Sequence, residues 1–463
     1  MSYTFPMRRS LLSAVIGLVL VGVAAPPAAT GPPCPQTPTY DAAVTSPQDA
    51  IPGWPFLRAS TDDIVSYTQL VGSQSDRVRV GQFATSWNGT PLLYALVGST
   101  GNIQRAEEIA AAQQSLRDPR KIRPRDANGI IDGNPAIVWY AGNVHGLETS
   151  GADAALQILY ELAARSDCEV EEMLGELLIG IVPTQNPDGR DAMARTNAYG
   201  FDMNRDWFAR TQPEIDGELD LLSAYPPVLF IDAHEMGSSD FFFPPNDDPI
   251  HHEITDQSLH WINDIYSPAI KAAFEERQQT EPIHWDYFNY ETYDLFYMGY
   301  GDSAPTTGFT AAGMTFEKGT ADPDDQREEE QFVAGWASLM AAADHKDEIL
   351  RQYHDAHVQA LAEGRRGELQ PNHVVVPGNE LRTQVPPLRI RNYFLRAGTA
   401  QPEVYHLIER LMDMGVEVYR LTRRARLPAI QTYGDEPRRT RLRKGTYWIP
   451  MAQPQKHWIQ ALL

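Results

Sequence analysis

The sequence contains few cysteines, no excess of positive charge and no internal repeat. Cys34 and Cys168 are its two cysteines, so the fold does not rest on a disulfide framework, although the two would be able to pair in an exported protein. The formal net charge is −22, which argues against nucleic acid and against an anionic membrane surface as partners. With 42% hydrophobic and 22% charged residues, the 463-residue chain has the composition of a globular protein of two or three domains.

Long hydrophobic runs are also rare, and the one near the N-terminus has a specific pattern. Arg8 and Arg9 precede the apolar stretch LLSAVIGLVLVGVAA, and small residues and prolines follow it. This order predicts a secretory signal peptide over residues 1–30 and export to the periplasm or the extracellular space, with a retained membrane anchor as the alternative. No second stretch reaches the length of a membrane span, so we expect no other membrane contact.

The next part of the chain divides by composition. Residues 31–60 are rich in proline and threonine and are predicted to be a linker. From 61 to 347, apolar runs such as AIVWYAGNV and PVLFIDAH alternate with helical stretches such as TSGADAALQILYELAARS. Buried strands interleaved with amphipathic helices predict an α/β fold in which helices cover both faces of the sheet.

Residues 366–463 are predicted to form a smaller C-terminal α/β region. HVVVPG and LRIRNYFLRAG resemble strands, and PEVYHLIERLMDMG resembles a helix that ends at Gly415. The sequence stops after a strand and the start of a helix. Either this region is compact or the natural chain continues beyond it.

Polar residues collect where the apolar runs of residues 61–347 end. His145 and Glu148 follow AIVWYAGNV. His234 ends PVLFIDAH, and Glu317 follows GMTF. Because the carboxyl ends of strands in an open α/β sheet meet at one edge, where ligands bind, we expect these four side chains to converge.

Two histidines and one carboxylate are a typical ligand set for catalytic zinc, with the fourth position left for water. His145 and Glu148, three residues apart, can reach one ion from the same turn, and His234 would complete the set from another strand. An HxxE pattern alone is a weak signal, because a simple capping turn has the same spacing. The hypothesis of a zinc site therefore depends on the other motifs.

Five motifs, in order along the chain, resemble those of the zinc carboxypeptidase family, the M14 metallopeptidases. They are HGLE with His145 and Glu148, NPDG at 186–189, DMNRD at 202–206, DAH with His234, and MTFEKG with Glu317. The resemblance covers roughly residues 60–345. It implies a zinc-carboxypeptidase-like α/β/α sandwich with a mixed central sheet. Residues 366–463 are similar to the extra C-terminal region of large bacterial secreted members.

The resemblance implies roles for the residues near the ion. One Zn²⁺ would be held by His145, Glu148 and His234. Glu317 would be the general base that takes a proton from the metal-activated water and delivers it to the leaving amine. Asp202 matches the carboxylate that orients the first zinc histidine.

The DMNRD motif would recognise the end of a peptide. Arg205 offers a rigid fork for bidentate binding of a terminal carboxylate, with Asn204 beside it. That contact would make the enzyme an exopeptidase. Asp206 departs from the family, in which an asparagine usually follows the arginine.

Two further roles each have two candidates. Arg195 fits best as the arginine that stabilises the oxyanion, and Arg190 is its competitor. Tyr297 fits best as the mobile tyrosine that closes over the substrate in the family, and Tyr300 is its competitor. We place Arg195 and Tyr297 with the catalytic residues on this basis.

The sequence as a whole predicts an exported zinc metallocarboxypeptidase that removes C-terminal residues from peptides. Within the enzymes, a cell-wall peptide hydrolase and an aspartoacylase-like amide deacylase are the alternatives. A non-catalytic peptide-binding protein of the same fold is the alternative from another class. The expected partner is a peptide or protein with a free C-terminus, without nucleic acid; the oligomeric state is not predicted.

Overall fold

A computed structural model describes residues 34–237, 241–242, 250–277, 297–370, 388–396, 398, 400–432 and 436–463. The predicted signal peptide over residues 1–30 lies outside these ranges. Within them, the helices are all too short or too polar to pass through a lipid bilayer.

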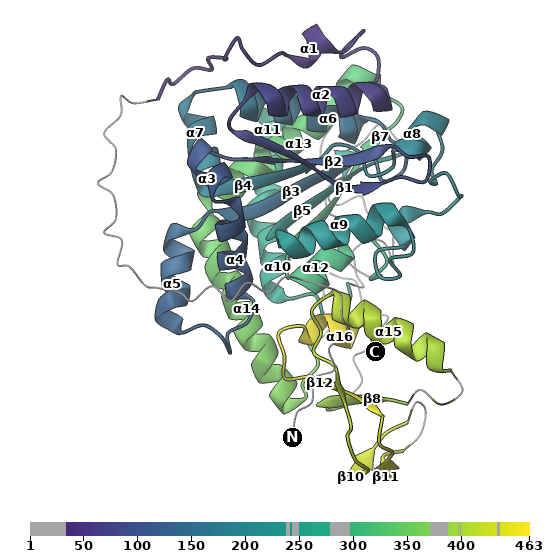
Figure 1. Ribbon diagram of the computed structural model, residues 1–463. Helices are drawn as coiled ribbons and strands as arrows, with labels where there is room; N and C mark the ends of the chain where they lie inside the picture. Colours follow the sequence, from purple (N-terminus) through teal and green to yellow (C-terminus); the bar gives the residue numbers. More distant parts are fainter. Residues whose placement is uncertain are drawn as a thin grey trace.

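A mixed sheet of seven strands forms the centre of the molecule (Figure 1). The strands are β1 (Val78–Thr85), β2 (Pro91–Val97), β3 (Ala136–Gly142), β4 (Leu177–Val182), β5 (Leu229–Met236), β6 (Phe241–Phe242) and β7 (Ala312–Gly319). They are arranged in the order β1-β2-β4-β3-β5-β7-β6, with β4, β3, β5 and β7 parallel and the outer strands antiparallel. The parallel strands are almost entirely buried, as their continuous apolar runs require.

Helices cover both faces of this sheet (Figure 1). One layer contains α2 (Thr61–Gln74), α5 (Pro124–Gly133), α6 (Ser150–Ala164), α7 (Cys168–Glu176), α10 (Asp256–His260), η2 (Trp261–Tyr266), α11 (Ser267–Glu276), α13 (Asp324–Asp344) and α14 (Lys346–Arg366). The other layer contains α3 (Thr100–Gln104), α4 (Ala106–Leu116), α9 (Pro213–Ala224) and α12 (Ser303–Phe309). Each layer packs a separate apolar core against the sheet. The predicted α/β sandwich with a mixed central sheet is confirmed.

The C-terminal region packs onto the second helical layer. It contains β8 (Asn392–Leu395), α15 (Gln401–Asp413), β9 (Tyr419–Arg420), β10 (Ala425–Ile430), β11 (Arg438–Leu442), β12 (Tyr447–Pro450) and α16 (Lys456–Leu462). β8, β12 and β9 form one small sheet, and β10 pairs with β11 in a hairpin. Leu411 and Trp458 belong to the same buried cluster as Phe309 of α12. The separate domain over residues 366–463 stays a prediction, and this shared core shows what holds the region in place.

A buried ionic network also joins α16 to the rest of the molecule. Lys456 Nζ lies 2.6 Å from Glu253 Oε2 and 3.1 Å from Glu363 Oε2 on α14. His457 Nδ1 lies 2.7 Å from the same oxygen of Glu253. Burial alone raises the pKa of Glu253, but the hydrogen bond and charge of His457 and the charge of Lys456 lower it to about 2. Buried charges of this kind are costly unless they are paired, so the network depends on all its members.

We expect Glu253→Gln to lower the free energy of unfolding by about 3 kcal/mol, because it leaves the ammonium of Lys456 buried with Glu363 as its remaining counter-charge. Chemical denaturation measures the effect, and Glu275→Gln, an exposed partner of Lys271, is the matched control with a change below about 1 kcal/mol. The stabilisation by Glu253 is present above the ordinary glutamate pKa of 4.5 and is lost as the pH falls toward about 2. The difference between wild type and variant should therefore shrink over that range.

The described part of the predicted linker lies against α6 and α7. Cys34 forms a disulfide with Cys168 at the start of α7, so the two cysteines are paired. The amide of Ser166 donates to Thr39 O at 3.0 Å, and Tyr40 forms an isolated β-bridge with Arg165. A short helix, α1 (Pro47–Ala50), follows. The segment is thus attached to the first helical layer at several points.

Candidate active site

The side chains of His145, Glu148 and His234 meet at the carboxyl ends of β3 and β5. His145 Nδ1 lies 2.7 Å from Glu148 Oε1, and His234 Nδ1 lies 2.9 Å from Glu148 Oε2. The two Nδ1 atoms are 3.2 Å apart. One ligand atom from each of the three lies within 4.8 Å of the others, and all three residues are buried. The structure therefore brings together the three residues that the sequence predicts as metal ligands.

The turn that carries the first two residues is held by Asn143, the residue after β3. Asn143 adopts a left-handed backbone conformation with φ of 64°, which asparagine tolerates better than most residues. Its Nδ2 donates to the carbonyls of His145, Gly146 and Glu148 at 2.9 to 3.1 Å. Three backbone acceptors are thus satisfied by one buried amide, which fixes both ligands relative to β3.

The NPDG motif supports the same turn from β4. A Cβ atom on Gly146 would lie 1.9 Å from the carbonyl carbon of Gly189, so the two backbones approach as closely as glycine allows. Asn186 begins α8 (Pro187–Ala192): its Oδ1 accepts from the amide of Gly189, and its Nδ2 donates to Val144 O at 3.1 Å. Asp188 is bonded to Ser86 Oγ at 2.7 Å. The NPDG motif therefore packs against the turn that carries His145 and Glu148 and stabilises it, without supplying a metal ligand.

Each histidine has a carboxylate behind it. His145 Nε2 donates to Oδ1 of Asp202, the carboxylate predicted to orient this ring, at 3.3 Å. His234 Nε2 donates to Asp232 Oδ2 at 2.8 Å, a contact that the sequence analysis missed. An Nε2–H bond to a carboxylate leaves the lone pair of Nδ1 for an ion and fixes the orientation of the ring. Asp232 precedes His234 by two positions on β5, so both side chains lie on one face of the strand.

These carboxylates create a strong negative field. Burial raises the pKa of Glu148, but the charge of His145 and hydrogen bonds from His145 and His234 lower it to about 2. Burial lowers the pKa of His234, yet Asp232 and then Glu148 raise it well above its ordinary value. The pKa of His145 is also raised: burial opposes the rise, whereas the Glu148 charge and the Asp202 hydrogen bond produce it. The cluster thus favours a positive charge between the rings.

The donor set fits zinc. Ligand atoms at 2.0–2.1 Å from a tetrahedral ion lie about 3.3 Å apart, close to the separation of the two Nδ1 atoms. Two imidazoles and one carboxylate also leave one position for water, which distinguishes a catalytic site from a closed structural site. His145, Glu148 and His234 would hold the ion, with Asp202 and Asp232 as partners of the two rings.

Glu317 lies beside this cluster on β7. It is the register partner of His234 on the neighbouring parallel strand, and both residues are buried. Register partners on adjacent strands are about 4.8 Å apart and leave the sheet on the same side. The predicted general base is therefore placed next to a predicted ligand.

The two arginine candidates have different surroundings. Arg195 Nη1 lies 3.3 Å from His145 Nδ1 and 3.7 Å from Glu148 Oε1. Its side chain is 44% exposed. Arg190 is buried and donates to Ala59 O and to Asp153 Oδ1, each at 2.7 Å. Arg195 is thus at the cluster, whereas Arg190 fastens the N-terminal segment to α6.

The DMNRD motif lies beside the tyrosine loop. Within η1 (Met203–Arg205), Asn204 Oδ1 accepts from the amide of Gly301 at 2.7 Å, and its Nδ2 lies 3.3 Å from His234 Nε2. The guanidinium of exposed Arg205 lies 4.5 Å from the ring centre of Tyr300. Tyr297 is 49% exposed, and its ring is 5.2 Å from that of Tyr300. The structure therefore brings these substrate-binding candidates together at the edge of the metal cluster.

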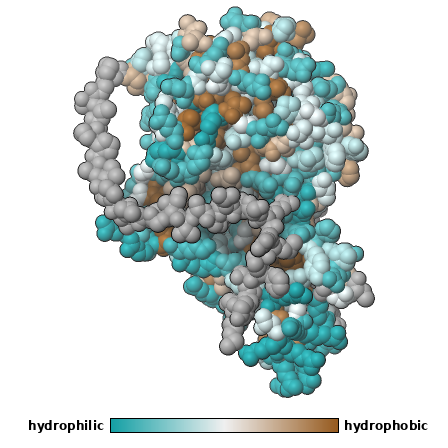
Figure 2. All heavy atoms as spheres, viewed as in Figure 1, coloured by the Kyte–Doolittle hydropathy of each residue, from teal (hydrophilic) through white to brown (hydrophobic). Residues whose placement is uncertain are grey.

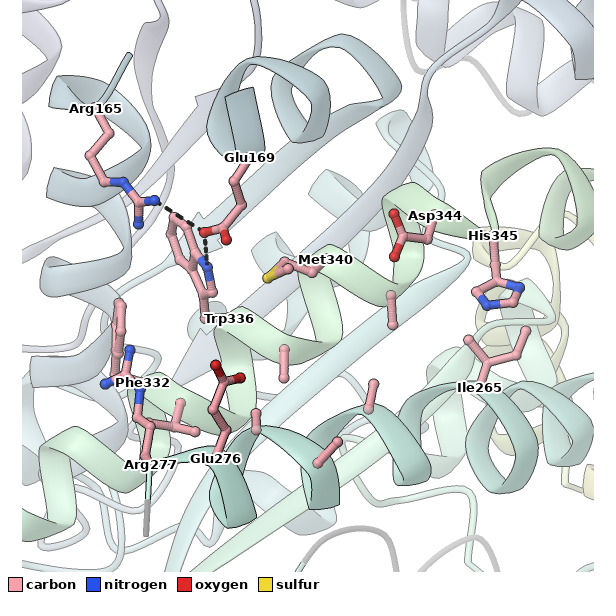
Figure 3. A pocket seen from close by; sticks show the side chains of 16 residues that line it. Arg165, Glu169, Ile265, Glu276, Arg277, Phe332, Trp336, Met340, Asp344 and His345 are labelled. Atoms are coloured by element: carbon pink, nitrogen blue, oxygen red, sulfur yellow. Dashed lines mark hydrogen bonds and ion pairs between the residues drawn. The ribbon is translucent and has the colours of Figure 1, made fainter. Parts of the chain in front are cut away.

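A separate cavity of about 720 Å³ lies between α11 and α13, on the first helical layer (Figure 3). Alanine side chains and Phe332 form much of its lining, and charged residues surround them. Glu169 accepts hydrogen bonds there from Arg165 and from the indole of Trp336. The residues that line this cavity do not include the predicted site residues.

Comparisons with known proteins give one family and several relatives. The family described as "Zinc carboxypeptidase" matches residues 64–303, slightly more than half of the chain. Carboxypeptidase 2 of Trichophyton rubrum is 32% identical over 141 residues, 30% of this chain and 23% of that protein. Human carboxypeptidase D is 28% identical over 165 residues, 32% of this chain and 12% of that protein.

Each aligned region thus covers less than a quarter of the relative's own length. Among solved structures, a metallo-carboxypeptidase from Burkholderia cenocepacia has a TM-score of 0.44 at 18% identity, over 62% of this chain and 69% of its own. The family match includes all three metal-binding candidates, two in the turn after β3 and the third on β5. The chain belongs to the zinc carboxypeptidase family, the M14 metallopeptidases.

Proposed function

We propose that the protein is an exported zinc metallocarboxypeptidase that hydrolyses the last peptide bond of peptides with a free C-terminus. The observation that carries the proposal is the buried group of His145, Glu148 and His234 with Glu317 in register beside it. A bound zinc ion would supply a Lewis acid and a water of lowered pKa. The Cys34–Cys168 disulfide supports export, because such bonds persist in oxidising compartments.

The protein's own residues would perform the remaining steps. Glu317 takes a proton from the attacking water and gives it to the leaving amine. Arg195, exposed beside the cluster, offers a positive charge to the oxyanion that forms on the scissile carbonyl. Arg205 and Asn204 bind the terminal carboxylate of the peptide. The exposed ring of Tyr297 would cover the bound residue.

Release of free amino acids from a peptide panel tests the proposal. Each peptide is supplied with a free and with an amidated C-terminus, and products are quantified by mass spectrometry. Release that requires the free carboxylate is the expected result. A zinc-loaded enzyme that releases nothing from any free-ended peptide would contradict the proposal and direct attention to cell-wall fragments, acylated amino acids or a binding role.

Arg205→Gln is expected to raise KM for free-ended peptides by about 10- to 100-fold, because it removes a charge-assisted hydrogen bond to the terminal carboxylate. The ratio between free and amidated peptides should fall by the same factor. The KM of Arg205→Lys should lie between those of the wild type and Arg205→Gln, since lysine keeps the positive charge but lacks the planar guanidinium fork. Arg105→Gln, an exposed arginine at the end of α3, is the control; an equal rise in its KM would refute the role of Arg205.

A further inference from the structure

The β10–β11 hairpin is strongly basic although the protein is acidic. Residues 420–444 contain eight arginines, one lysine and two carboxylates, a formal charge of +7, whereas the whole chain carries −22. The nine basic side chains are all exposed. The hairpin projects at the foot of the molecule, away from the seven-stranded sheet, and the same region is hydrophilic at the surface (Figures 1 and 2).

Five of these arginines lie on one face of the hairpin. Arg426 of β10 is the register partner of Arg441 of β11. Alternate residues of a strand point to the same side, so Arg439 of β11 lies on the same side as Arg441. Arg424 and Arg443 directly adjoin the strand ends, two positions from Arg426 and Arg441, and continue the same alternation. We call this set the arginine face: Arg424, Arg426, Arg439, Arg441 and Arg443. The residues between them are less exposed, and Leu442 is buried.

The arginine face places like charges close together. Like charges directly opposite each other on paired strands are destabilising, as at Arg426 and Arg441. Side chains of the arginine face make no ion pair or hydrogen bond with another residue in the described parts of the chain. A concentrated positive charge without a counter-charge of its own fits an anionic partner.

The spacing and residue type indicate which anion fits. Alternate positions of a strand are about 6.6–6.8 Å apart, which is also the repeat of any extended polypeptide. Acidic residues at every second position would therefore meet successive arginines. Arginine binds carboxylates through a planar fork, which lysine lacks. Outside the hairpin the chain carries a net charge of −29, which on balance repels an acidic peptide.

We propose that the arginine face binds extended acidic segments of polypeptide. Only the biological purpose of this binding rests on the proposed peptidase function: the arginine face would hold acidic substrates that the body of the enzyme repels. Binding itself does not require hydrolysis. The hairpin thereby becomes a substrate-recruiting surface outside the metal site.

Fluorescence anisotropy with amidated, labelled peptides tests binding alone. The alternating peptide repeats glutamate and threonine in turn and places all its carboxylates on one face of an extended chain. The block peptide has the same composition, but its glutamates come first and its threonines last, which divides the carboxylates between both faces. We expect the alternating peptide to bind more tightly, and its binding to weaken with added salt. Changing all five residues of the arginine face to glutamine should weaken this binding by at least about tenfold.

The matched control removes five positive charges from exposed residues of the body: Arg105, Lys121, Arg125, Arg365 and Arg366, each changed to glutamine. An equal loss of binding in this control, or equal binding of the two peptides, would overturn the proposal. Tighter binding of a thymidine oligonucleotide as long as the alternating peptide would overturn it in favour of a phosphate partner. Hydrolysis of neutral peptides is measured separately, so failure of acidic-peptide binding leaves the proposed function intact.

Discussion

Glu317→Gln is expected to lower kcat by about 1000-fold while zinc stays bound. The amide keeps the shape of the side chain but cannot take a proton from water, and general-base catalysis contributes about 10²–10⁴-fold. Since Glu317 is not among the three candidate ligands, the metal content should not change. Steady-state hydrolysis of a free-ended peptide and metal analysis of the same samples measure the two quantities.

Glu328→Gln is the matched control for Glu317→Gln. Burial, together with Asp153 and two other acidic neighbours, raises the pKa of Glu328 to about 8, so this carboxyl group is already largely protonated at neutral pH. Its replacement by glutamine should leave kcat unchanged. Wild-type kcat in Glu317→Gln would assign the proton transfer to another group, and loss of zinc would make Glu317 part of the metal centre itself.

The central strands and the convergence of the site could be predicted because both depend on local patterns. β3 is apolar throughout and polar residues follow it, whereas β5 and β7 begin with apolar residues and carry polar ones toward their carboxyl ends. Parallel strands bring such ends to one edge whatever the sequence between them. This is why residues as far apart as His145 and Glu317 could be assigned to one site.

Asp232 and Asn143 were not predicted, because their roles depend on side-chain geometry. Asp232 stands inside an apolar strand, and only the alternation of β5 places it on the same face as His234. Because Asp232 and His234 are two positions apart, the period of a strand would have predicted that their side chains lie on the same face. Asn143 acts through its left-handed backbone and three carbonyl acceptors, which exist only once the turn has closed.

Two features of the C-terminal region were not predicted from the sequence. The net charge of −22 argues against anionic partners, yet residues 420–444 carry +7. The packing of α16 on α12 and α14 joins segments about 100–150 residues apart, through Trp458 and the pairs of Lys456. Neither the buried ionic network nor the shared core has a local sequence signal, because the residues that contact each other are far apart in the sequence.

His234→Ala is expected to weaken zinc binding by at least about 100-fold. Structural zinc sites with four ligands bind with about 10–16 kcal/mol, so one ligand accounts for roughly 2.5–4 kcal/mol. Asp232→Asn should weaken it less, by about 10- to 100-fold, because it removes the carboxylate that fixes the ring of His234 and leaves all three ligands. Competition with a fluorescent zinc chelator measures all affinities without reference to activity.

Asp206→Asn is the control that separates the loss of zinc affinity in Asp232→Asn from a general loss of stability. Asp206 is a buried aspartate of the same DMNRD region, but its carboxylate accepts from Thr211 and the amide of Gln212, not from a metal-site histidine. It should lower stability and leave zinc affinity unchanged. Wild-type zinc affinity in Asp232→Asn would make Asp232 a structural residue only. Wild-type affinity in His234→Ala would place the ion elsewhere, because a tetrahedral site with an open position cannot lose one of its three protein ligands without cost.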